Sequence, residues 1–277
     1  MALVGLSIPS KFQEIFKLMA CRRADEDAPR VEFETMGTLV FNRDRKLESL
    51  RLRAGTHDTL APKARRPSPT DARSRAYSTA YHTHFYDPQR EYNVPTVQDV
   101  LMFVVYNTVS RFFCGLDPAW GAVRSSELVM TDLGVYIIQN APDEDNKLSD
   151  RILAKPLSRP SVVAAVQGNG ISMTGSPEGF HKLIESIVFE TAHAVMKKPR
   201  GGFADKMMET FPELTAIDHA KDLMSIRFMQ QADAQQTYLD LFRLVGVRVD
   251  FVPWPDSGHP LTYKAPMPAI AVEPLND

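Results

Sequence analysis

Apolar residues recur along the first part of the chain at the spacings typical of helices and strands. Residues 8–20 gather their apolar side chains on one helical face, which predicts a short amphipathic helix. β-Branched and aromatic residues around one glycine predict a strand over 31–41, and the alternation over 46–53 predicts its hairpin partner. A further strand is expected over 77–84, after a long polar loop.

A long apolar run predicts a largely buried helix from Val94 to about Phe113. Thr96 stands at its start and Asp99 follows three residues later. In this pattern a hydroxyl and a carboxylate cap the first turn of a helix. Residues 127–139 then read as strand, tight turn and strand.

The later part of the chain is predicted to be mainly helical. We expect a helix over 177–198, a short helical piece over 204–209, and one long helix or two over 217–244. A late strand is expected within 244–254. The last twenty or so residues hold four prolines and are expected to lie extended on the surface.

These elements predict an α+β protein in which helices flank a mixed β-sheet. A length of 277 residues allows one large domain or two small ones. We expect an N-terminal helix and linker over 1–28 and a core over 29–140. A helical extension with the late strand and the Pro-rich tail would follow over 141–277, packed on the core.

The composition, with 44% hydrophobic and 24% charged residues, is typical of a globular protein. A formal net charge of −2 gives no reason to expect nucleic acid or a membrane surface as a partner. No apolar run approaches the ~20 residues of a membrane span, and the start lacks the order of a signal peptide. The two cysteines make no disulfide framework, so we expect an intracellular, cytoplasmic protein.

Two histidines one residue apart provide the candidate chemistry. On an extended strand His82 and His84 leave the same face, where two imidazoles can bind one metal ion from one side. Asp99 is a plausible third ligand. Hydrolysis of an amide with Zn²⁺ also needs a base and an oxyanion donor. Glu34 could transfer the proton, and Thr96 could donate its hydroxyl to the tetrahedral oxygen.

Each part of this set also has a simpler interpretation. A His-x-His pair on a strand is often only a surface pair. Thr96 with Asp99 is in the first place a helix cap, although a cap can also position the acid as a ligand. Glu34 alone is only a charged residue on a strand. Found together in one sequence, the three parts favour the metal centre over these separate interpretations.

The order of these residues resembles the JAMM motif of the JAB/MPN metalloproteases. That motif reads His-x-His, several residues, then Ser-x-x-Asp, with a glutamate well upstream. The matching segments are His82-Thr-His84, Thr96-Val-Gln-Asp99 and Glu34-Thr-Met-Gly37, and the resemblance covers about residues 30–140. The loop between the second histidine and Thr96 is a few residues longer than usual. Phe85 stands where a proline is usual, and Thr96 replaces the commoner serine.

The resemblance implies an MPN/JAB-like (cytidine-deaminase-like) core. By it, His82, His84 and Asp99 would bind zinc, Glu34 would be the acid/base, and Thr96 would take the serine's role. Members of the family cleave peptide or isopeptide bonds, often next to ubiquitin or a ubiquitin-like modifier. The expected function is therefore that of a zinc-dependent metallopeptidase or isopeptidase acting on a protein or peptide substrate.

Two alternatives remain. Some members of the family have lost the zinc, so the chain could be a structural or adaptor subunit that binds an assembly partner through residues 141–277. A non-proteolytic zinc hydrolase or deaminase is the other. The deaminase pattern needs a Cys-x-x-Cys pair, which the sequence lacks. His181 with Glu185, and Glu190 with His193, have helical spacing and are explained by a solvated helix face.

Overall fold

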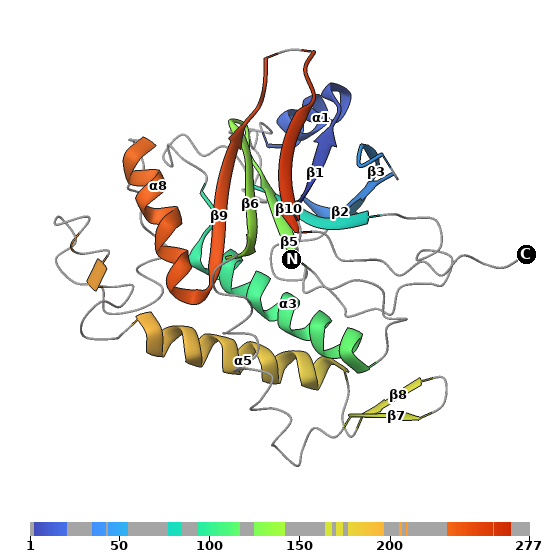
Figure 1. Cartoon of the computed structure of the whole chain (residues 1–277), viewed down its shortest axis with the longest axis vertical. Helices are drawn as coiled ribbons and strands as arrows, with labels where there is room; N and C mark the ends of the chain where they lie inside the picture. The colour runs from blue at the N-terminus through green and yellow to red at the C-terminus, as the bar shows by residue number, and fades with distance from the viewer. Residues whose placement is uncertain are drawn as a thin grey trace, which may run out of the picture.

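The computed structural model of the chain is an α+β protein with a mixed sheet, as predicted, and this sheet has six described strands (Figure 1). It describes residues 3–20, 35–42, 44–54, 77–84, 94–116, 125–141, 164–167, 170–173, 177–196, 205–206, 209, 232–256 and 258–266. Among these residues, no helix is both long and apolar enough to cross a membrane.

The central sheet has the strand order β3-β2-β4-β5-β6-β9. Its strands are β2 (Thr35–Phe41), β3 (Leu47–Ala54), β4 (Tyr77–Thr83), β5 (Ser126–Met130), β6 (Gly134–Asn140) and β9 (Val247–Pro253). β4 and β5 run parallel, whereas the other four neighbouring pairs are antiparallel. The connection from β4 to β5 contains α3 (Val97–Leu116), since parallel strands need a crossover of this kind.

Three helices pack on one face of the sheet: α3, α5 (Pro177–Met196) and α8 (Ala232–Leu241) (Figure 1). They share one apolar core with β5, β6 and β9. Its fully or almost fully buried members include Phe103, Val129, Ile138, Ile184, Val188, Leu239 and Val249. α3 contributes apolar side chains to this core along most of its length, which confirms the prediction of a largely buried helix.

The opposite face packs against α1 (Ser10–Ala20) and a two-stranded sheet of β1 (Leu3–Ile8) and β10 (Leu261–Pro266). Phe16 of α1 is fully buried and meets Tyr81 of β4 edge to face, with ring centroids 5.4 Å apart. Successive side chains of a strand point to opposite faces of the sheet. Because Tyr81 lies in this second core, its neighbour His82 lies on the face toward α3.

The expected surface position of the last residues is wrong for 261–266. Leu261, Tyr263 and Ala265 are buried, and β10 pairs with β1 from Leu3↔Pro266 to Ile8↔Leu261. Neither strand was predicted. Each is short, and its hydrogen-bond partner lies at the other end of the sequence, where a local pattern cannot show it. Pro266 lies on an edge strand of a two-stranded sheet, a position that proline tolerates.

The predicted 141–277 extension supplies part of the central sheet. β9 pairs with the whole of β6, after a short 3₁₀ turn, η4 (Phe242–Val245), and Gly246 with φ 75°. β7 (Ala164–Gln167) and β8 (Gly170–Met173) form a separate hairpin. The helix predicted over 217–244 is described only from residue 232 onward.

Replacing Ile184 by valine should show that α5 unfolds together with the sheet. Ile184 is fully buried in the core shared with α3, so loss of one methylene should lower the free energy of unfolding by about 0.5–1.5 kcal/mol. Urea unfolding followed by circular dichroism would measure this free energy. Leu18→Ala on α1, where Leu18 is 70% exposed, should change the free energy of unfolding by less than about 0.5 kcal/mol. An equal effect of both substitutions would contradict this packing.

Candidate metal centre

β4 places the two histidines on the α3 face of the sheet. His82 pairs with Met36 of β2 and Val129 of β5, and is therefore held by strands on both sides. The backbone N–H of His84, just past the end of β4, donates to Met130 O at 2.9 Å. Both histidines are buried, with 6% and 9% of their surfaces exposed, and so they are not a surface pair.

The first turn of α3 presents Asp99 to these histidines. The predicted capping box is present: the Asp99 N–H donates to the Thr96 hydroxyl at 3.2 Å, and the Thr96 N–H donates to Asp99 Oδ2 at 2.7 Å. The Thr96 hydroxyl also donates to Asp99 Oδ2, at 2.8 Å. The carboxylate is thus fixed by the helix start, a position where the helix dipole also favours a negative charge.

The three side chains converge on one point. His82 Nε2 lies 3.2 Å from His84 Nε2 and 3.6 Å from Asp99 Oδ1, and His84 Nε2 lies 3.3 Å from Asp99 Oδ2. Zinc–nitrogen bonds of about 2.0–2.1 Å in a tetrahedral site separate neighbouring ligand atoms by about 3.3 Å. These distances are of that size, so His82, His84 and Asp99 could hold a metal ion.

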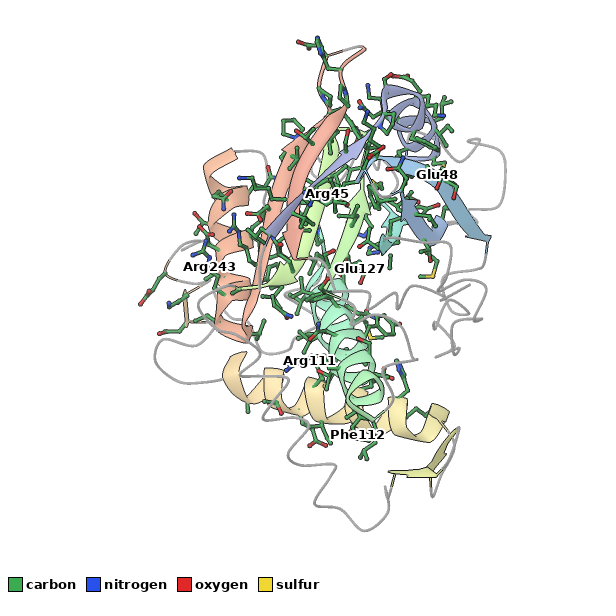
Figure 2. The ribbon with its side chains drawn as sticks, turned by 45° about the vertical axis from the view of Figure 1, so that its right-hand side comes forward. Arg45, Glu48, Arg111, Phe112, Glu127 and Arg243 are labelled. Atoms are coloured by element: carbon green, nitrogen blue, oxygen red, sulfur yellow. The ribbon has the colours of Figure 1, made fainter. Side chains whose placement is uncertain are left out.

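Glu127 is a member of this cluster that sequence reasoning missed. It lies on β5, and Figure 2 shows it on the side of the sheet toward α3. Its Oε1 is 3.1 Å from His82 Nδ1, and its side chain is buried. The available signal was an acidic residue in the strand Ser126–Met130, whose residues are otherwise mostly apolar and all buried. An ionised carboxylate is seldom buried without a partner.

The electrostatics of the cluster favour a bound cation. Burial works to raise the pKa of Asp99, but the hydrogen bond and charge of His84, the charge of His82 and the Thr96 N–H outweigh it and hold that pKa well below its usual range. Asp99 is therefore ionised at neutral pH. The Asp99 carboxylate thus places a negative charge at the point where His82 and His84 converge, in a largely buried site, and a bound cation would balance that charge.

α8 fixes the start of α3 from the other side. The hydroxyl of buried Tyr238 donates to Pro95 O at 3.1 Å, one residue before the cap. Burial and the nearby Asp99 carboxylate raise the pKa of Tyr238, so the phenol keeps the proton that it donates. A residue of the 141–277 segment thus helps to place Asp99.

The structure brings together four of the five predicted site residues: His82, His84, Thr96 and Asp99. Glu34 lies outside the described residues. Its neighbour Thr35 begins β2, where its N–H donates to Thr83 Oγ1 at 3.0 Å and its carbonyl accepts from the same hydroxyl at 3.3 Å. The catalytic roles of Glu34 and Thr96 stay predictions.

Among the described residues the metal-ligand cluster is His82, His84 and Asp99, and it does not include His181, Glu185 or Glu190. The side chain of His193 lies outside the described part of the chain. The His181 ring stacks on Tyr106 with centroids 5.4 Å apart. Glu190 accepts a hydrogen bond from Ser186 at 3.2 Å on the exposed side of α5.

Removing the Thr96 hydroxyl should test the cap. Thr96→Ala should lower the free energy of unfolding by about 1 kcal/mol, because the Asp99 N–H loses its acceptor, whereas Thr96→Ser should stay close to wild type. Chemical denaturation of the metal-free proteins would measure both. Equal stability of the alanine and serine variants would mean that the hydroxyl contributes nothing to the helix start.

Comparison with known proteins adds no relative to this picture. The chain matches no protein-family model, and neither a curated protein nor a solved structure is significantly similar to it. What the centre does is therefore inferred from its own residues and their placement.

Proposed function

We propose that the chain is a zinc-dependent hydrolase of the JAMM type that cleaves a peptide or isopeptide bond, with ubiquitin-like conjugates as the first substrate class to test. The observation that supports this most is the convergence of His82, His84 and Asp99 at ligand-to-ligand distances of 3.2–3.6 Å. These are the residues that the motif resemblance assigns as ligands.

The ligand set favours a catalytic rather than a structural site. Structural zinc sites are usually closed by four protein ligands, whereas catalytic sites have three and leave a position for water or substrate. Among the residues that the structure describes, two imidazoles and one carboxylate make three. Zinc held in this way would polarise a substrate carbonyl and lower the pKa of its bound water.

Glu34 is the proposed general base. The motif resemblance gives it this role, and β2 begins at its neighbour Thr35, with Met36 paired to His82 of β4. Glu34 would take a proton from the attacking water and deliver it to the leaving nitrogen.

Thr96 is the proposed oxyanion donor. Its hydroxyl and its backbone N–H both donate to Asp99 Oδ2, so the carboxylate keeps one of these bonds when the hydroxyl turns away. The hydroxyl proton can then stabilise a negative oxygen that forms on the substrate. A serine at this position would offer the same group.

An adaptor subunit without catalysis is the second candidate. The observation that favours it is that the cluster satisfies itself through its own hydrogen bonds. His82 Nε2 and His84 Nε2 are 3.2 Å apart, within hydrogen-bonding reach, and Asp99 is already capped by Thr96. In the adaptor hypothesis, residues 141–277 bind an assembly partner, and the cluster only stabilises the fold.

Metal analysis separates these two candidates. The purified chain, loaded with Zn²⁺ and dialysed, should retain one zinc per chain by mass spectrometry because three ligand atoms already converge. A His82→Ala, His84→Ala double variant should retain none. His181→Ala is the matched control, since this histidine stacks on Tyr106 away from the cluster, and should bind like wild type. If the wild-type chain retains no zinc after dialysis, the adaptor function is favoured.

Glu34→Gln should separate metal binding from catalysis. This variant should keep its zinc and lose at least about 100-fold in cleavage rate, because glutamine cannot carry the proton. The assay is hydrolysis of a panel of ubiquitin-like conjugates and peptides. Glu32→Gln, the same change two residues earlier, is the control and should cleave at close to the wild-type rate. Full activity of Glu34→Gln would remove this residue from the mechanism.

A further inference from the structure

We propose that Glu127 is a positioning residue of the metal centre, which holds the His82 ring so that Nε2 is the nitrogen available to the cation. The inference rests on the proposed metal binding and goes beyond the motif, since Glu127 lies 45 residues after His82 on another strand.

The pairing of β4 with β5 brings the two side chains together. Ala80 lies opposite Glu127 and His82 lies opposite Val129, so Glu127 is one same-face step from the histidine. The two ring nitrogens of His82 then have different neighbours. Nδ1 is 3.1 Å from Glu127 Oε1, while Nε2 is 3.2 Å from His84 Nε2 and 3.6 Å from Asp99 Oδ1.

The proposed role of Glu127 is to accept a hydrogen bond from His82 Nδ1, its contact at 3.1 Å. In that arrangement Nδ1 is the protonated nitrogen of the ring. A neutral imidazole with its proton on Nδ1 has its lone pair on Nε2, the atom that faces the other ligands. Without Glu127, the Asp99 carboxylate near Nε2 would favour a proton on that nitrogen, and a protonated nitrogen cannot bind a metal.

The burial of Glu127 is hard to explain by stability alone. Only 6% of its surface is exposed, and its strand neighbours Leu128, Val129 and Met130 are fully buried. A buried charged pair is often no more stabilising than apolar side chains of similar volume. A carboxylate that orients a metal-binding histidine is, by contrast, a recurring feature of zinc sites and strengthens metal binding.

Affinity measurements test this role. Glu127→Leu should weaken Zn²⁺ binding about 10- to 100-fold in competition with a chromophoric chelator, and Glu127→Gln should fall between it and wild type. Glu48→Gln on the edge strand β3 is the control and should bind like wild type; Figure 2 labels Glu48 well away from Glu127. Thermal unfolding of the metal-free variants reports whether they fold. Unchanged affinity in a folded Glu127→Leu variant would overturn the proposal.

The tautomer of His82 is a second readout that needs no metal. Long-range ¹H–¹⁵N correlation spectra of the metal-free chain should show His82 protonated on Nδ1 in wild type and shifted toward Nε2 protonation in Glu127→Leu. Wild type with the proton on Nε2 would overturn the positioning role. If the wild-type chain shows the expected His82 tautomer but binds no zinc, the proposed function is wrong. The hydrogen bond from His82 to Glu127 is then still supported. If wild type and Glu127→Leu bind zinc with equal affinity and show the same His82 tautomer, only the positioning role is wrong.

Discussion

The parallel pairing of β4 with β5 is the constraint on which the candidate centre depends. Two parallel strands that follow each other in sequence need a crossover, and here the crossover is α3. The helix therefore starts close to the edge of the sheet where β4 ends, and its first turn faces His82 and His84. Antiparallel pairing of the same strands would have removed the need for the helix and separated Asp99 from the histidines.

The cluster also depends on polar groups that compensate each other's burial. Two imidazoles and two carboxylates taken from water would be costly alone, but each is within bonding distance of another. The capping box adds two donors to Asp99, and Tyr238 holds the residue before the cap. Side chains held by several partners lose little further freedom when a ligand arrives, which is the condition for a pre-organised site.

Local patterns predicted the parts of the fold that local sequence determines. The buried helix α3, its Thr96–Asp99 cap and the strand with the two histidines follow from periodicity and capping chemistry within a few residues. Glu127 could not be found in this way, because its contact with His82 depends on strand register across α3. β1 and β10 were missed because each becomes a strand only when the other is beside it.

The pairing of β1 with β10 has a mechanical consequence. Residue 3 lies opposite residue 266, and the antiparallel ladder runs from there to Ile8 and Leu261. A force applied between residues 3 and 266 would pull the two strands apart across their hydrogen bonds, and those bonds would break one after another. This small sheet would therefore open from that end, one residue pair at a time.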